Sequence, residues 1–394
     1  MFSICIETSC DETSIAICRL EGMVGHAYQN LYSKINSLEV VGALTHSQIK
    51  NHQQFGGVVP EYGARLHAEQ IHSLFQILLD FVSQKTSLQP REVLSQVEYI
   101  FVAGEVGLVS ALRVGQEFAK SVRYFLQKQT QKQIELKVIS HLIGHIFSCF
   151  YQIELKKDWQ TGILESTTNV VEQFQDEEIF PHLHLLVSGG NTQIILLSSP
   201  TNWQIVGKTI DDAAGECFDK IGRMLGLPYP GGVLISQIAV LEEQNYFDFP
   251  VSMKHADSFN LSYSGLKTAV RYFLQKPPIK GFVIEKPLKK AEILELLESP
   301  LENLNFKLKF IKQTCISAQT VIIKQLINQF GKAIKQFNPK SIGLSGGVSA
   351  NLLLRNKILE FGISPTFITQ LPLTGDNAVM IGLAGVVDKS FRLP

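Results

Sequence analysis

The chain has 394 residues, a length typical of two or three domains. Its 36 Lys and Arg balance its 36 Asp and Glu, so the formal net charge is zero, which argues against a globally basic nucleic-acid-binding protein. A hydrophobic content of 45% with only 18% charged residues allows a large core and argues against wholesale disorder.

The cysteines and the N-terminus indicate a protein of the reducing cytosol. No two of the six cysteines have C-x-x-C spacing, so neither a zinc ribbon nor a thioredoxin-type site is indicated. The N-terminus lacks a basic segment followed by a long apolar run, and no stretch of about 18 apolar residues occurs. We therefore expect a cytoplasmic protein with no signal peptide and no membrane contact.

The first half of the chain predicts a strand hairpin followed by helices and further strands. The expected elements are strands 2–7 and 14–18 around a polar turn at 8–13, a helix over 64–84, a strand at 99–103, a Gly-containing turn at 104–109 and a helix through Phe125.

The second half repeats the strand–turn–strand pattern. The expected elements are strands 183–187 and 193–197 around the turn 188–192, a helix over 211–226, and a strand at 341–344 whose Gly-rich turn, 345–351, opens a helix. The recurrence predicts two α/β lobes around a central cleft.

Two segments interrupt this pattern. Residues 152–180 have no steady period, and residues 276–305 contain four prolines and one short expected helix, 290–298. Both are interpreted as surface insertions.

His141 and His145 are spaced four residues apart, so both imidazoles lie on one face of a helix and can reach one metal ion. An isolated pair of this kind is more often two ordinary helix residues. The position after His141 is Leu142, so the glutamate of an H-E-x-x-H protease is missing. Asp376, before an apolar helix, is either that helix's N-cap or a third ligand.

Three further features allow both a functional and a structural interpretation. The turn from Glu7 to Thr13 could bind phosphate or orient water, or only satisfy its own backbone. Glycine pairs at 189–190, 231–232 and 346–347 would let backbone approach a phosphate closely, although turns also use glycine. Asp212, Glu216, Asp219 and Lys220 fall near one helical face, which could bind ribose hydroxyls or simply be solvated.

Taken together, these motifs resemble those of the tRNA adenosine threonylcarbamoyltransferases, a family of the actin/Hsp70-like ATPase superfamily. The matching stretches, in family order, are I-E-T-S-C-D-E-T at 6–13, F-G-G-V-V-P-E at 55–61, H-x-x-G-H at 141–145, L-V-S-G-G-x-T-Q at 186–193, I-D-D-A-A-G-E-x-F-D-K at 210–220, Y-P-G-G at 229–232, F-N-L-S-Y-S-G-L-K-T at 259–268, G-G-V-S-A-N at 346–351 and D-N-A-x-M-I-G at 376–382. They cover most of the chain outside the two insertions.

The resemblance implies a two-lobed, ribonuclease H-like α/β fold with a central cleft. It implies an N-terminal lobe over 1–137, with a C-terminal helix, 377–394, packing back on it. The second lobe would cover 138–376 and carry both insertions.

The resemblance also implies a reaction: transfer of threonylcarbamoyl from threonylcarbamoyl-AMP to N6 of the adenosine 3′ of the anticodon, in tRNAs that read codons beginning with A. The implied ligands of one divalent metal ion, iron(II) ahead of zinc, are His141, His145 and Asp376. The implied substrate-binding residues are Leu186, Val187, Ser188, Gly189, Gly190, Asp219, Gly232 and Asn351. No residue is assigned as the general base. The implied partners are tRNA and helper proteins, namely a catalytically inactive paralogue and a small ATPase.

Four positions depart from the family pattern. Ile143 replaces the glutamate inside the histidine pair, and Asn191 replaces the histidine of S-G-G-H-T-Q. Glu105 adds a charge to a normally neutral turn, and Gly375 replaces the threonine before the ligand aspartate. None of these changes removes an implied metal ligand.

Three other functions compete with the transferase. A non-catalytic scaffold paralogue would lack the histidine pair and the aspartate, which this chain keeps. A metalloprotease, an older label for the family, would need the glutamate missing at 142, and a sugar kinase would hold Mg²⁺ with acidic residues alone.

A tRNA contact is expected at the densest basic stretch, although a solvated surface is an equal interpretation. Its lysines are Lys276, Lys280, Lys286, Lys289, Lys290, Lys307, Lys309 and Lys312.

Overall fold

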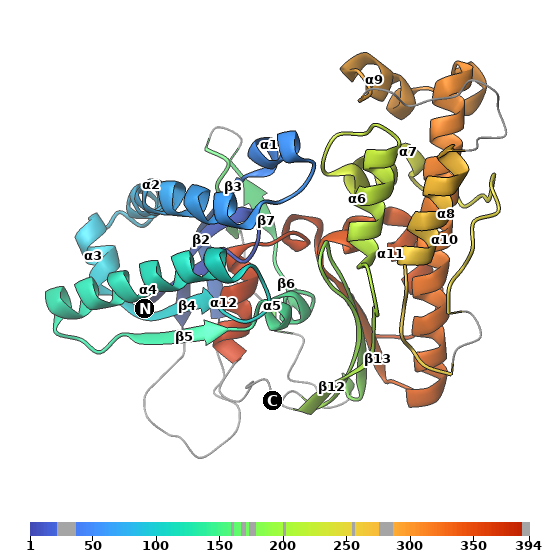
Figure 1. Ribbon diagram of the computed structural model, residues 1–394. Coiled ribbons are helices and arrows are strands. Elements are labelled where there is room, and N and C mark those ends of the chain that lie inside the picture. The colour runs from blue at the N-terminus through green and yellow to red at the C-terminus, as the bar shows by residue number, and fades with distance from the viewer. Residues whose placement is uncertain are drawn as a thin grey trace. The chain divides into compact units, whose positions relative to one another are not determined.

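The computed structural model describes residues 1–21, 37–158, 161–166, 171–172, 179–199, 202–253, 257–275 and 287–387 (Figure 1). They form two compact units. Unit 1 comprises Met1–Lys50, Val58–Asp176 and Gln370–Pro394, and unit 2 comprises Asn51–Gly57 and Glu177–Thr369. No described helix has the length and hydropathy required to cross a bilayer.

Unit 1 is built on a seven-stranded sheet of order β5-β4-β1-β2-β3-β8-β7. The strands are β1 (Phe2–Glu7), β2 (Glu12–Glu21), β3 (Ser37–Ser47), β4 (Val97–Ala103), β5 (Glu135–Ile139), β7 (Leu155–Lys157) and β8 (Leu164–Ser166). The helices are α1 (Ile49–His52, which reaches into unit 2), α2 (Pro60–Thr86), α3 (Pro90–Ser95), α4 (Val109–Thr130), α5 (His141–Ser148) and α12 (Ala378–Val387), and a small ribbon joins β6 (Tyr151–Gln152) to β9 (Val171–Glu172).

Strand β1 is buried on both faces, and its alternate side chains contact different helices. Phe2, Ile4 and Ile6 join a core cluster with apolar residues of α2 and α4. The intervening residues face the other way, since a Cβ on Gly382 of α12 would lie 2.7 Å from Cys5 Sγ. Glu7 continues this second series, so the end of β1 delivers a carboxylate to the face covered by α12 and α5.

Unit 2 has a five-stranded sheet of order β12-β11-β10-β13-β14. The strands are β10 (His182–Val187), β11 (Thr192–Ser199), β12 (Asn202–Lys208), β13 (Ser341–Ser345) and β14 (Thr366–Ile368). The helices are α6 (Ala214–Met224), α7 (Gly231–Ala239), α8 (Ser264–Gln275), α9 (Lys290–Glu298), α10 (Phe306–Phe337) and α11 (Leu352–Leu359).

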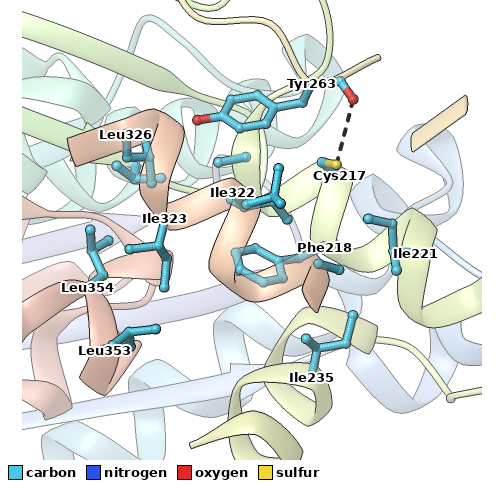
Figure 2. Packing of buried hydrophobic residues seen from close by; sticks show 14 of the residues in the cluster. Cys217, Phe218, Ile221, Ile235, Tyr263, Ile322, Ile323, Leu326, Leu353 and Leu354 are labelled. Carbon is cyan, nitrogen blue, oxygen red and sulfur yellow. Dashed lines mark hydrogen bonds between the residues drawn. The ribbon is translucent and has the colours of Figure 1, made fainter. Parts of the chain in front are cut away.

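The core of unit 2 lies between one face of this sheet and its helices. Leu183, Leu185 and Val187 of β10 contribute to it from the sheet. Figure 2 shows the helical side, where Phe218 of α6 and Ile235 of α7 pack with α10 and α11. Helices α6 and α7 approach closely because Gly222 faces Gly231. A Cβ on Gly222 would lie only 2.7 Å from the Gly231 Cα atom.

The two units repeat one local topology. In unit 1, β1 pairs antiparallel with β2 and parallel with β4. In unit 2, β10 pairs antiparallel with β11 and parallel with β13. The two hairpins expected from the sequence are thus present, each beside a parallel strand.

The units divide the chain differently from the expected lobes. Residues 138–176 belong to unit 1, because α5 packs against α12 and β8 pairs with β3. The described part of the expected C-terminal helix, α12, packs against β1 and β4 of the same unit. Residues 388–394 lie outside the described residues.

The two insertions are more than surface decoration in their described parts. Strands β7 and β8 extend the sheet of unit 1, and Ile163 beside β8 is fully buried in its core. In the second segment, α9 has the expected bounds of 290–298, and Leu296 on it is buried in the core of unit 2. Neither the missing period of the first segment nor the prolines of the second indicated that Ile163 and Leu296 would be buried in the cores.

The helix expected over 211–226 is shorter. Helix α6 begins at Ala214; before it, Asp211 accepts from the Tyr263 N–H, and Asp212 pairs with Lys267 of α8 and Lys220 of α6. Asp212 therefore does not share the helical face of Asp219. The two Asp212 carboxylate oxygens lie 2.9 Å from Lys220 Nζ and 2.6 Å from Lys267 Nζ.

Candidate metal centre and glycine loops

Helix α5 carries the histidine pair in a fully buried setting. Its first residue is His141, and the spacing of four residues brings the ring of His145 to a centroid distance of 4.6 Å. Gly144 lets α12 approach, since a Cβ there would lie 3.2 Å from Ile381 Cδ1. The pair is therefore held against α12.

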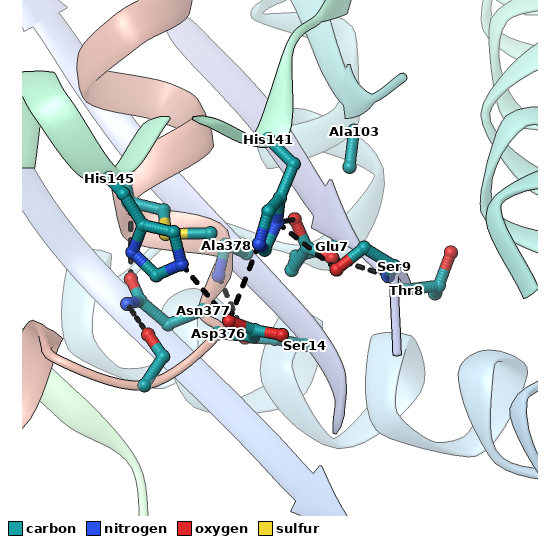
Figure 3. A network of polar contacts seen from close by, with 12 residues as sticks. Glu7, Thr8, Ser9, Ser14, Ala103, His141, His145, Asp376, Asn377 and Ala378 are labelled. Atoms are coloured by element: carbon teal, nitrogen blue, oxygen red, sulfur yellow. Dashed lines mark hydrogen bonds and ion pairs between the residues drawn. The ribbon is translucent and has the colours of Figure 1, made fainter. Parts of the chain in front are cut away.

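Asp376 faces both imidazoles (Figure 3). Its Oδ1 atom lies 3.2 Å from His145 Nε2 and 3.5 Å from His141 Nε2. The neighbouring Asn377 accepts a hydrogen bond from the Met380 backbone N–H and so caps α12. Because Asn377 occupies the cap position, the carboxylate of Asp376 remains available at the histidine pair.

The three side chains fit a divalent metal ion. One ligand atom from each of His141, His145 and Asp376 can be chosen so that all lie within 4.8 Å of one another. Two imidazole nitrogens and a carboxylate oxygen are a donor set that several divalent transition metals accept. Among the described residues, none offers a hydrogen bond to the buried Nδ1 of His145.

Glu7 and Ser9 hold His141 from the opposite side of its ring. Glu7 Oε2 lies 3.1 Å and Ser9 Oγ lies 3.0 Å from His141 Nδ1. A carboxylate at Nδ1 favours the proton there and leaves Nε2 facing Asp376. This contact of Glu7 was not predicted from the acidic turn, although the position of Glu7 at the end of a buried strand could have indicated it.

The charges of Glu7, His141, His145 and Asp376 alter one another's pKa values. Burial lowers the pKa of His141, but the carboxylates of Asp376 and Glu7 outweigh this and raise it to about 9. Burial lowers the pKa of His145, and Asp376 opposes this only in part. Burial raises the pKa of Asp376, whereas His141 and His145 together lower it to about 2.

The rest of the turn after β1 mainly secures the local structure. Thr8 Oγ1 donates to the Ala111 carbonyl, and Thr13 Oγ1 lies 2.7 Å from His67 Nδ1. Burial, followed by the charges of Asp11 and Asp376, raises the pKa of Glu12 well above its usual value. The threonines of the turn therefore have a structural role, while phosphate binding or water orientation by the turn stays a prediction.

In unit 2, the predicted substrate loop follows β10. The side chains of Leu186 and Val187 are fully buried, so only their backbone could meet a substrate. Ser188 donates its backbone N–H to the Asn191 carbonyl, which closes the turn. A Cβ on Gly189 or Gly190 would meet nothing within 4 Å, so this backbone is accessible to a close ligand.

A second glycine loop follows the neighbouring strand β13. Gly346 has φ +88° and packs on the Val187 backbone, so it requires a glycine conformation. Gly347 has open space like that at Gly189 and Gly190. Because β10 and β13 are parallel, both loops lie at the same edge of the sheet.

The remaining predicted residues surround α7. Asp219 Oδ1 accepts a hydrogen bond of 2.8 Å from the Gly232 backbone N–H. The Asn351 side chain donates to Ser236 Oγ and Gln319 Oε1 and accepts from the Leu354 N–H. Asp219 and Gly232 therefore lie together, whereas the Asn351 amide is already committed to contacts within unit 2.

Comparison with known proteins identifies the family. The family model described as tRNA N6-adenosine threonylcarbamoyltransferase matches residues 39–159 and 164–383. The chain belongs to this family. A family member from Mycoplasma capricolum is 32% identical over 96% of this chain and 95% of its own length, and one from Fervidobacterium nodosum is 34% identical over 98% and 93%.

Solved structures agree with the fold class. The crystal structure of HypF from T. kodakarensis aligns with a TM-score of 0.50 at 11% identity, over 98% of this chain and 47% of that one. At this identity the likeness concerns the fold alone. The chain has the α/β fold of the actin/Hsp70-like ATPases.

The positions that depart from the family pattern occupy different environments. Ile143 is buried in α5, so an apolar contact stands where the family has a carboxylate. Glu105 is exposed, and its backbone carbonyl accepts from the His141 N–H. Neither residue displaces a side chain of the metal cluster.

Proposed function

We propose that this protein transfers threonylcarbamoyl from threonylcarbamoyl-AMP to N6 of the adenosine 3′ of the anticodon, in tRNAs reading codons that begin with A. Membership of the family over nearly the whole chain supports this reaction. One observation carries the proposal: His145 and Asp376, 231 positions apart, meet beside His141 in a geometry that fits a metal ion.

His141, His145 and Asp376 would hold one divalent metal ion, which we propose to be iron(II) ahead of zinc. When bound, such an ion supplies Lewis acidity toward an acyl carbonyl. In this chain, Glu7 holds the proton at His141 Nδ1, so Nε2 of His141 becomes a ligand once its own proton is displaced, whereas burial favours the neutral form of His145. No described side chain stands out as the general base.

The glycine loops of unit 2 would bind the nucleotide part of the substrate. The open backbone at Gly189, Gly190 and Gly347 supports phosphate binding by backbone N–H groups. We propose that Asp219, which accepts from the Gly232 N–H, also binds a ribose hydroxyl. The Asn351 amide would support the site indirectly, by holding α7, α10 and α11 together.

The proposed macromolecular partners are tRNA and the helper proteins of the transfer complex, in the cytoplasm where tRNA acts. Lys289, Lys290 and Lys309 are exposed and suit phosphate contacts. Lys312 does not, because it is buried and donates to the Leu296 and Ser299 carbonyls at the end of α9. Lys276, Lys280 and Lys286 of the same prediction lie outside the described residues.

The test is a reconstituted transfer assay with threonylcarbamoyl-AMP, tRNA and the helper proteins. Wild-type protein is expected to form threonylcarbamoyladenosine, detected by mass spectrometry of nucleosides, and His145→Ala is expected to lose both product and bound metal. The exposed His72→Ala is the matched control and should keep both. A wild type that forms no product with competent helpers would favour the scaffold alternative.

A further inference from the structure

Two histidines of β10 lie buried beside the base of the glycine loops. His182 and His184 are fully buried and, two residues apart, point to the same face of the sheet. This face is opposite to that of Leu183 and Leu185, which pack in the core of unit 2. Neither histidine belongs to the metal cluster or to the predicted substrate loop.

The neighbouring strand β13 is adapted to these rings. Gly343 pairs with His184 in the parallel register, and a Cβ on it would lie 2.7 Å from His182 Nε2 and closer still to His184 Nδ1. Only glycine leaves room for both imidazoles. Ser341 and Ser345, on either side of Gly343, put hydroxyls on the same face.

These side chains form a continuous series of hydrogen bonds, and the donor of each bond can be assigned in turn. Ser341 Oγ donates its proton to the Ile179 carbonyl, so His182 Nδ1, 2.7 Å away, must donate to Ser341. In a neutral ring, His182 Nε2 then carries no proton and accepts a hydrogen bond from His184 Nδ1 at 3.3 Å. His184 Nε2 is bare in turn and accepts from Ser345 Oγ at 2.7 Å. With both rings neutral, as their complete burial favours, each carries its proton at Nδ1.

This chain of hydrogen bonds ends where the second glycine loop begins. Ser345 is the last residue of β13 and precedes Gly346, whose backbone packs against Val187 at the end of β10. His184 thus ties Ser345 at the base of one loop to β10, the strand from which the other loop departs.

We propose that His184 is a positioning residue for the nucleotide of the substrate. By accepting a hydrogen bond from the Ser345 hydroxyl, it fixes the spacing of the loops at 188–190 and 346–347. The inference rests on the proposed function, since it assigns the nucleotide to these loops. Releasing Ser345 lets the second loop shift and weakens nucleotide binding, while the metal cluster in unit 1 is untouched.

A matched pair of substitutions separates positioning from general packing. Gln places an amide oxygen near the position of imidazole Nε2, so His184→Gln keeps an acceptor for Ser345. Asn reaches only the position of Nδ1, so His184→Asn keeps the contact with His182 and loses Ser345. Ser345→Ala removes the same bond from the other end and serves if His184→Asn does not fold.

The measurements are calorimetric binding of AMP and the KM and kcat for threonylcarbamoyl-AMP. His184→Asn and Ser345→Ala should each raise Kd and KM about tenfold, the worth of one hydrogen bond, with kcat within about twofold. His184→Gln should stay within about twofold of wild type. The ¹⁵N spectrum of the wild type should show a protonated Nδ1 and a bare Nε2 in both rings.

Equal AMP affinity in His184→Gln and His184→Asn, or a protonated Nε2 on either ring, would overturn the positioning role and leave the proposed function intact. A wild type that binds no AMP and transfers nothing would instead overturn the nucleotide site and the proposed function together.

Discussion

The carboxylate of Glu7 lies 3.1 Å from Nδ1 of His141, at the end of a buried strand, and Asp376 lies on the Nε2 side of the same ring. Glu7 belongs to β1, so this carboxylate contact comes from a different element than the histidine pair, within which Ile143 is apolar. The metal cluster thus depends on a residue 134 positions away from the histidine that it orients.

Glu7→Gln should weaken metal binding by about 10- to 100-fold, because an amide holds the His141 ring less firmly and raises its basicity less. The measurement is competition with a chelator of known affinity. Glu61→Gln, on an exposed glutamate of α2, is the control and should bind metal like the wild type. Unchanged affinity in Glu7→Gln would show that Glu7 has no orienting role.

Metal binding should depend on pH through His141. Its pKa of about 9 in the metal-free protein means that the ring is protonated at pH 7, so the ion must displace one proton. Apparent affinity should rise about tenfold per pH unit and level off above about pH 9. Calorimetry in buffers of different ionisation enthalpy should give about one proton released at pH 7, and release of none would contradict the assignment.

The metal-free protein should show the opposite trend in stability. Because the folded pKa of His141 is raised, its protonated form stabilises the fold fully below about pH 6.5, and this contribution is lost as pH rises through about 9. Thermal unfolding of chelator-treated protein between these values is the measurement. His141→Gln should remove this part of the pH dependence; an unchanged profile in the variant would contradict the ion pair.

Asp211 should stabilise the start of α8. Its carboxylate accepts from the Ser262 and Ser264 hydroxyls and from the Tyr263 and Ser264 backbone N–H groups. Burial raises the pKa of Asp211, but these donors outweigh that effect and lower it. Asp211→Asn should cost about 1–3 kcal/mol at pH 7, measured by urea unfolding, with exposed Asp248→Asn as the neutral control.

The sign of this effect can be checked with acid. A lowered folded pKa gives stability that is present above about pH 4 and is lost as pH falls through the folded value. The difference between wild type and Asp211→Asn should therefore shrink below about pH 4. A difference that grows with acid would refute the hydrogen-bonded carboxylate.

Gly190→Ala should separate binding from folding. A Cβ at Gly190 meets nothing within 4 Å, so the melting temperature should stay within about 2 °C of wild type. The same methyl group would stand where we place the substrate phosphate, so KM for threonylcarbamoyl-AMP should rise severalfold. Gly215→Ala is the contrasting variant, because its Cβ would lie 2.8 Å from the Gly189 Cα atom and should destabilise the protein.

Charge reversal at Lys289 and Lys290 should weaken tRNA binding and reduce its salt dependence, since both side chains are exposed at the start of α9. Filter binding at several salt concentrations measures both effects. Reversal at exposed Lys340 is the control. Lys312→Glu should instead destabilise the fold, because its ammonium group holds the end of α9. Unchanged tRNA affinity in the double variant would show that Lys289 and Lys290 do not bind tRNA.

The sequence predicted the hairpins and the two α/β lobes because strong apolar runs flank polar or glycine turns. The boundaries of the lobes were harder to predict from the sequence. The side of the chain on which 138–176 falls depends on α5 packing against α12, a contact between distant segments. The period of the first insertion gave no sign that β8 would pair with β3, because a three-residue strand is too short to show alternation.

The candidate site was predictable where spacing decides and not where three-dimensional packing does. The i,i+4 spacing placed His141 and His145 on one helix face, but the local sequence did not indicate that Asn377, and not Asp376, would cap α12. Asn351 looked like a substrate ligand from its motif, yet three hydrogen bonds within unit 2 engage its side chain. The hydrogen bonds that link His182, His184 and Ser345 depend on the register of β10 with β13, which could not be predicted from the local sequence.

Metal-dependent transfer by His141, His145 and Asp376 can be tested by measuring the threonylcarbamoyladenosine formed per tRNA as metal is removed and restored. Chelator-treated protein should form no product, iron(II) should restore product formation in proportion to the metal bound, and Asp376→Asn should not be restored. Transfer at the wild-type rate by protein shown to be free of metal would contradict a metal-dependent reaction.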